Sequence, residues 1–169
     1  MSDLQKLLAL LFLKSAPQDL SYSPSLTVQL LVAYIFSGVL VMQTTLNPDD
    51  LFVGILLGLF VQFVFAYTVL SALDRRQRFL QTFCALIGVG ALFNLISWPI
   101  FSVLSDPVAA DSMKANMSLL FLFLISWEVL VKAHIFKHAL EMKMYGAMAL
   151  SFSMFFITVA LSQLLFPAQ

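Results

Sequence analysis

Four titratable side chains lie close together in a chain that otherwise carries little charge. They are Glu128, Lys132, His134 and His138, in the stretch WEVLVKAHIFKH. On a helix, Glu128 and Lys132 fall about 40° apart, and glutamate four residues before lysine is the favourable order for a helical ion pair. Two interpretations follow. The pair fixes the docking of a helix, in this chain or against a partner subunit, or Glu128 serves as the acid in a proton or cation step.

The two histidines raise the question of a metal site. His134 and His138 are four residues apart on one helix face, a spacing that binds a metal such as zinc when a third ligand is supplied. Glu141 is a third ligand in principle. These three residues lie at or beyond the polar end of an apolar segment, where polar side chains cost little. We therefore predict a solvated helix end, with no metal and no cofactor, and treat the three as weak candidates only.

The composition excludes an ordinary soluble domain. Of the 169 residues, 61% are hydrophobic and 11% are charged, and the mean hydropathy is +0.96. A soluble fold of this size has too high a surface-to-volume ratio to hide so much apolar surface. The formal net charge is zero, so no basic field attracts nucleic acid. Cys84 is the only cysteine, which excludes an intrachain disulfide. We predict an all-α integral membrane protein surrounded by lipid.

Five segments reach the roughly 20 apolar residues that a helix needs to cross a bilayer. We place the spans at about residues 26–46, 51–73, 79–104, 117–136 and 145–166. A turn with Asn47-Pro48 separates the first two spans, and the polar stretch SDPVAADSMKAN separates the third from the fourth. Residues 25–169 are thus expected to form one five-helix transmembrane domain.

Residues 1–24 form a separate cytoplasmic lead-in and linker in this interpretation. Ser2 and Gln5 have capping-box spacing, which favours a helix that starts at once. An apolar stripe then faces Asp3, Lys6 and Lys14, and such a helix is expected to lie in the membrane interface; the stripe is Leu4, Leu7, Leu8, Leu11 and Phe12. A cleaved signal peptide is the alternative, with a cut near Ala16.

The distribution of basic residues predicts the orientation, because cytoplasmic loops carry the excess of lysine and arginine. With five spans, eight basic residues fall on the side of the N-terminus and only Lys114 on the other; the eight are Lys6, Lys14, Arg75, Arg76, Arg78, Lys132, Lys137 and Lys143. The acids Asp49, Asp50, Asp106 and Asp111 fall on the side of Lys114. We expect a cytoplasmic N-terminus and an external C-terminus.

Small and polar residues inside the spans indicate how the helices pack. Gly54 and Gly58 form a GxxxG, which lets backbones approach closely, within the chain or in a dimer. Gly88 and Gly90 offer a similar face on the third span, as do Ala147 and Ser151 on the fifth. Proline in a helix frees a carbonyl, and near Pro99 the side chains of Asn94 or Ser97 are expected to help satisfy it, in a simple kink or at a transporter-like broken helix. An interhelical polar seam is expected from Gln29, Gln43, Gln62 and Tyr67.

One longer stretch resembles a known family. The sequence WEVLVKAHIFKHALEMKMYGAMAL is similar to the segment that joins the last two spans in bacterial members of the Yip domain family (Ypt-interacting proteins and their relatives). The resemblance implies five spans behind a cytoplasmic, amphipathic N-terminus, and a bacterial protein of the inner membrane. The eukaryotic signature around Asp-Leu-Tyr-Gly-Pro is missing, so binding of Rab-type GTPases and the family's functional residues do not transfer.

Two functions remain open at this point. Catalytic motifs such as a Walker loop, HExxH or GxSxG are absent from the sequence, and the loops are short, so we expect no enzyme. The first expectation is an accessory, assembly or membrane-organising component of a larger complex, with a membrane-protein partner or a second copy of the chain. The alternative is a small proton- or cation-linked transporter or channel-like protein that uses Glu128.

Overall fold

The computed structural model describes residues 2–44 and 50–166, and all regular structure within these ranges is helical. Five helices there are long and apolar enough to cross a membrane, which suits a multi-pass membrane protein. They are α2 (Pro24–Met42), α3 (Leu51–Ala72), α4 (Phe79–Leu104), α5 (Asp111–Leu140) and α6 (Met144–Leu165). Helix α1 (Asp3–Leu11) and the 3-10 turn η1 (Pro17–Asp19) precede them, and η3 (Arg76–Arg78) joins α3 to α4.

The predicted spans agree with these helices except at the fourth. The first prediction, 26–46, ends at residues that lie outside the described ranges, as does most of the Asn47-Pro48 turn. Helix α5 begins six residues before the predicted start and ends four residues after the predicted end. At 1.5 Å per residue its 30 residues extend about 45 Å, more than the roughly 30 Å hydrocarbon core. The polar residues at both ends therefore continue the helix beyond the apolar segment that the hydropathy pattern located.

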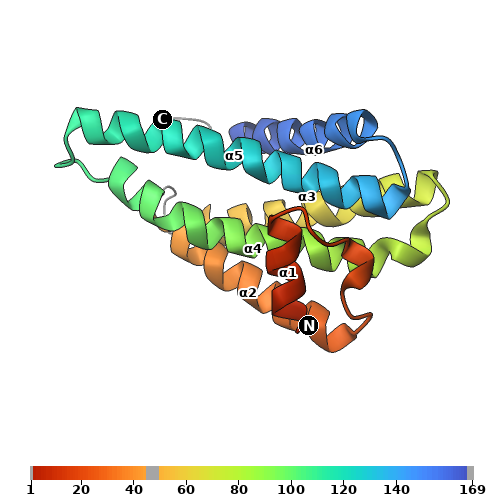
Figure 1. The fold of residues 1–169 in the computed structure, drawn as a ribbon. Coiled ribbons are helices and arrows are strands. Elements are labelled where there is room, and N and C mark those ends of the chain that lie inside the picture. Colours follow the sequence, from red (N-terminus) through yellow and green to blue (C-terminus); the bar gives the residue numbers. More distant parts are fainter. Residues whose placement is uncertain (1, 45–49, 167–169) are drawn as a thin grey trace.

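Helix α4 is the centre of the bundle and contacts α1, α2, α3 and α5. Every residue from Thr82 to Ala91 is buried, and several of them are small enough for neighbouring helices to approach closely. Figure 1 shows α2 beside α4 on one side of the bundle and α5 beside α6 on the other, with α3 behind them. Helix α6 packs on α5 and α3, whereas the other long helices pack directly on α4.

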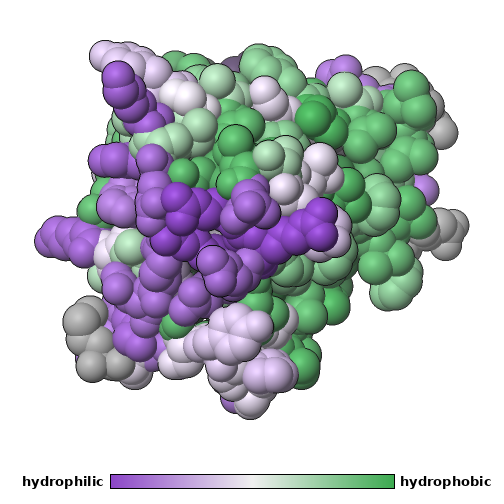
Figure 2. Space-filling model, turned by 90° about the vertical axis from the view of Figure 1, so that its right-hand side faces the viewer, coloured by the Kyte–Doolittle hydropathy of each residue, from purple (hydrophilic) through white to green (hydrophobic). Residues whose placement is uncertain are grey.

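The two ends of the bundle differ in charge. The end that holds the α3–α4 and α5–α6 connections carries Arg75, Arg76, Arg78, Lys137 and Lys143, and we call it the basic end. Figure 2 views this end and shows hydrophilic side chains gathered there among apolar ones. The other end, where α4 connects to α5, carries Asp106 and Asp111, and we call it the acidic end. Helices α2, α4 and α6 run from the basic to the acidic end, and α3 and α5 return.

Helix α1 crosses α4 rather than lying along it (Figure 1). The capping box of Ser2 and Gln5 is present as predicted. The placement of this helix in the membrane interface stays a prediction, and its apolar stripe divides into two parts. Leu7 and Leu11, together with Leu10, are buried against the bundle, whereas the rest of the stripe, Leu4, Leu8 and Phe12, is exposed. The lead-in is therefore packed on the five-helix domain.

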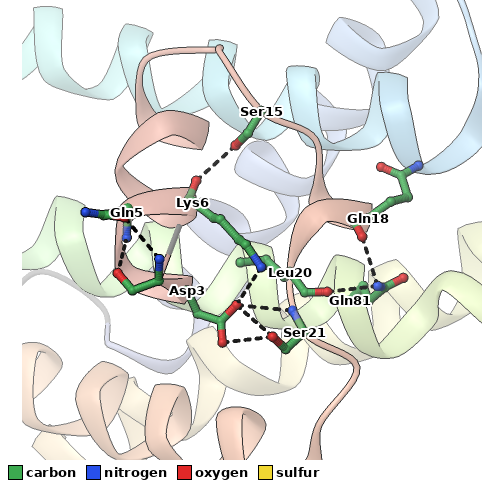
Figure 3. A network of polar contacts seen from close by, with 9 residues as sticks. Asp3, Gln5, Lys6, Ser15, Gln18, Leu20, Ser21 and Gln81 are labelled. Carbon is green, nitrogen blue, oxygen red and sulfur yellow. Dashed lines mark hydrogen bonds and ion pairs between the residues drawn. The ribbon is translucent and has the colours of Figure 1, made fainter.

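Polar contacts also hold the linker after α1 (Figure 3). The Asp3 carboxylate accepts hydrogen bonds from the Ser21 backbone and hydroxyl and pairs with Lys6 at 3.2 Å. The Ser21 hydroxyl is the main reason that the pKa of Asp3 is lowered. From α4, the Gln81 amide donates to the carbonyls of Gln18 and Leu20 at 3.1 and 2.9 Å. These bonds fix residues 15–21 against the basic end.

Candidate functional site

A cavity of about 260 Å³ lies between the five long helices. Each of them contributes at least one polar or small residue to its lining, and apolar and aromatic side chains form the rest. The polar and small residues are Tyr34 from α2, Gly58 and Gln62 from α3, Asn94 and Ser97 from α4, Glu128 and Lys132 from α5, and Ser151 and Thr158 from α6. This convergence makes the cavity the candidate site.

Glu128 and Lys132 form the ion pair that their spacing predicts. Lys132 Nζ lies 2.5 Å from Glu128 Oε1, and both residues line the cavity. The side chains are 29% and 17% exposed for Glu128 and Lys132, so each is partly enclosed but still reachable. Lys132 lies one turn nearer the basic end than Glu128. An ion pair in low dielectric is held by strong attraction at a large desolvation cost, so this pair is the dominant electrostatic feature of the cavity.

Tyr34 sits in a slot made by two glycines. A Cβ atom added at Gly58 would lie 2.7 Å from Tyr34 Oη, and one added at Gly90 would lie 2.9 Å from Tyr34 Cε2. The Tyr34 hydroxyl accepts a hydrogen bond from Gln62 Nε2 at 3.0 Å, and the same amide nitrogen donates to the Gly58 carbonyl at 3.1 Å. The two glycines thus make room for a buried tyrosine that faces the cavity.

The other predicted packing glycines have different neighbours. Gly54 is buried in α3. A Cβ atom at Gly88 would lie 2.7 Å from Leu7 Cδ2, so Gly88 is where α1 crosses α4. The predicted small face on α6 is also used, because Ala147 is buried and the Ser151 hydroxyl donates to the Val129 carbonyl at 2.7 Å. Within the described residues, these small side chains serve packing inside one chain.

Asn94 and Ser97 reach the cavity, but they do not serve Pro99 in the expected way. Asn94 Nδ2 donates to Ser37 Oγ at 3.3 Å, and Ser97 Oγ donates to the Asn94 carbonyl at 3.0 Å. The carbonyl that Pro99 cannot engage is that of Leu95, four residues before it. Pro99 itself is exposed on the outside of α4, which continues as one helix through it. Asn94 and Ser97 are therefore cavity residues, and Pro99 is not.

The histidines lie at the basic end, away from the cavity. His134 Nε2 donates to the Ser15 carbonyl at 2.9 Å, and the two imidazole rings meet edge to face with centroids 4.5 Å apart. The Glu141 carboxylate engages Arg75 at 2.6 Å and Arg78 at 2.5 Å, and these arginines, with the Arg78 hydrogen bond first, lower the pKa of Glu141. In residues 2–44 and 50–166, no three side chains of the metal-binding types are grouped to hold an ion.

No known protein family, curated protein or solved structure matches this chain. The resemblance to the Yip domain family stays a prediction.

The sequence pattern does not identify all the residues that line the cavity. Tyr34 and Thr158 were not singled out, although a tyrosine in the middle of a span is unusual, since tyrosine prefers the membrane interfaces. The predicted polar seam is mostly wrong, because of its four residues only Gln62 is buried. The other three are exposed: Gln29 and Tyr67 on the outside of α2 and α3, and Gln43 just after the end of α2.

Proposed function

We propose that this chain is a small transporter or channel-like membrane protein that binds a polar or ionic solute in the cavity between its spans. One observation carries the proposal. The Glu128–Lys132 pair faces a cavity to which all five long helices contribute, and not the outside of the bundle. A charged side chain inside a membrane span costs several kcal/mol of free energy, and such side chains usually mark a solute or ion pathway.

The titratable side chains that line the cavity are Tyr34, Glu128 and Lys132. Among them, Glu128 is the acid that a proton or cation step needs, and Lys132 balances its charge in the absence of solute. We place the chain in a bacterial inner membrane, with its N-terminus and basic end on the cytoplasmic side, in line with the positive-inside rule. In this orientation both side chains line the cavity, and Lys132 lies nearer the cytoplasm than Glu128.

The test is solute-dependent proton movement in liposomes that hold the purified chain and a pH-sensitive dye. Gradients of sodium, potassium, ammonium, small amines and small neutral polar solutes are imposed one at a time. We expect at least one to change the internal pH, and Glu128→Gln to abolish that change. Ser126→Ala, on the exposed face of α5, should leave the change intact. The proposal fails if no compound moves protons and none shifts the melting temperature in a Glu128-dependent way.

The accessory or assembly role stays a second prediction. The short loops, the amphipathic N-terminal helix and the small-residue faces of the spans support this role. Glu128 and Gly58, which could also contact a partner, have neighbours in the same chain, Lys132 and Tyr34. Purification in a gentle detergent at native expression, followed by mass determination, tests it. A second protein at fixed stoichiometry would support this role, and a lone monomer or homo-oligomer would remove it.

A further inference from the structure

The cavity is charged toward the basic end and has an aromatic pair at the acidic end, whereas Asn94, Ser97 and Thr158, in the halves of α4 and α6 nearer the acidic end, add uncharged polar groups. Lys132 and Glu128 lie in the second half of α5, which runs toward the basic end, and Phe121 lies in its first half. Phe101 and Val41 also line the cavity, near the ends of α4 and α2 at the acidic end. A molecule that fills the cavity thus meets charge at one end and aromatic or aliphatic side chains at the other. Phe101 and Phe121 contact each other there, with ring centroids 4.7 Å apart.

Gln62 supplies an acceptor that has no donor. Its amide nitrogen donates to Tyr34 Oη and to the Gly58 carbonyl, which fixes the orientation of the amide. Gln62 is 5% exposed, and its Oε1 has no hydrogen-bond partner among the described residues. A buried carbonyl oxygen without a donor is costly. The Oε1 atom is itself enclosed by protein atoms. Because Gln62 lines the cavity, a small shift of its side chain would bring this oxygen to the N–H or O–H donor of a ligand and remove the cost.

The charges of Glu128 and Lys132 cancel, so the choice between a cation and an anion depends on which of the two side chains can leave the pair. Glu128 already accepts an ammonium group, that of Lys132, at 2.5 Å. Lys132 has a flexible stem and lies nearer the basic end, so its ammonium can withdraw toward the interface when another takes its place. A bare metal cation instead prefers a close shell of six or more oxygens and would leave the apolar end unused. An anion would have to replace Glu128 at Lys132 and would leave that carboxylate, on its shorter side chain, unpaired inside the cavity.

We propose that the cavity binds a small organic amine in its ammonium form, with the ammonium at Glu128 and Gln62 and the apolar body toward Phe101 and Phe121. This inference rests on the proposed function and names the class of its solute. At the roughly 30 Å³ that one water molecule occupies in the liquid, 260 Å³ holds about nine non-hydrogen atoms.

The test compares probes with one body and different head groups. The purified chain in lipid nanodiscs is titrated calorimetrically with 2-phenylethylamine, 2-phenylethanol and phenylacetate, and separately with sodium chloride, all at pH 7. We expect saturable binding of the amine, at least tenfold tighter than that of the alcohol, and none of phenylacetate. Equal binding of amine and alcohol, or Glu128-dependent saturation by phenylacetate or sodium alone, overturns the amine assignment but keeps the proposed function. No saturable binding of any probe, together with no proton movement in liposomes, overturns both.

Variants separate the site from partition into lipid. Glu128→Gln should weaken amine binding at least tenfold, and Gln62→Met should weaken it several-fold. Lys132→Met removes the competing ammonium and should tighten amine binding several-fold, a gain that misfolding cannot produce. Ser126→Ala serves as the matched control and should bind like the native chain. Unchanged or weaker amine binding by Lys132→Met would contradict the proposed exchange of ammonium groups.

Discussion

The slot around Tyr34 makes a prediction that can be worked out from distances. In Gly58→Ala, the new Cβ atom would lie 2.7 Å from Tyr34 Oη, and the next nearest atom, Tyr34 Cζ, would lie at 3.8 Å. The clash is therefore with the hydroxyl alone. In Gly90→Ala, the new Cβ atom would lie 2.9 Å from Cε2 and 3.3 Å from Cδ2, so the clash is with the ring. Removal of the hydroxyl should relieve the first substitution and not the second.

The expected magnitudes follow from three opposing terms. Overpacking a core costs about 1–3 kcal/mol, and loss of the hydrogen bond between Gln62 and Tyr34 adds roughly 0.5–1.5 kcal/mol. Alanine in place of glycine inside a helix returns about 1 kcal/mol. Gly58→Ala alone should thus lower the free energy of unfolding by about 1–3 kcal/mol. In the Tyr34→Phe background the clash is gone, and Gly58→Ala should be neutral or stabilise by up to about 1 kcal/mol.

Equilibrium unfolding by titration with sodium dodecyl sulfate in mixed micelles measures these free energies. The six chains needed are the native one, the three single variants, and Tyr34→Phe combined with either glycine substitution. We expect a coupling energy of about 1–3 kcal/mol between Tyr34 and Gly58 and a smaller one between Tyr34 and Gly90. If Tyr34→Phe does not restore the stability of Gly58→Ala, or restores that of Gly90→Ala equally well, the described position of Tyr34 in the slot is wrong.

Three further predictions concern the lead-in and the basic end. Leu7→Ala should lower the free energy of unfolding by about 2–5 kcal/mol, because the side chain is buried, and hydrogen–deuterium exchange should show α1 released first. Glu141→Gln should lower stability at pH 7. The Arg78 hydrogen bond depresses the pKa of Glu141 from its ordinary 4.5, so this stability is present above that pH and is lost below it, and melting curves of the variant and native chains should converge in acid. Trp127→Phe removes the indole hydrogen bond to the Leu11 carbonyl and should cost about 0.5–1.5 kcal/mol by the same unfolding titration.

Hydropathy and helix chemistry predicted the long helices well. The boundaries of α3 and α4 and the start of α6 follow from apolar segments bounded by charged or polar residues, and the start of α1 follows from the capping box of Ser2 and Gln5. The extra turns of α5 could not be found in this way. Their residues are polar, and they remain helical because helix formation continues outside the apolar segment.

The candidate site was predicted only in part, and the reason is helix rotation. Sequence gives the depth of a residue in its span, but it does not show which face of a helix that is apolar all round turns inward. Gln62 is buried, whereas Gln29 and Gln43 are exposed, although all three are glutamines in or beside apolar segments. Glu128 and Lys132 were paired correctly because both lie on one helix, where the spacing alone decides the contact.

The depth of each polar side chain in its span explains why the polar residues of the cavity lie together. Tyr34 and Gln62 are 28 residues apart but bond directly, and Glu128 lines the same cavity. A polar side chain within a span needs a partner at its own depth, since lipid offers none. Lys132 is this partner for Glu128, and Tyr34 is the partner of the Gln62 nitrogen. The Gln62 oxygen has no donor among the described residues. A solute with an ammonium group supplies that donor, and its charge matches the carboxylate across the cavity.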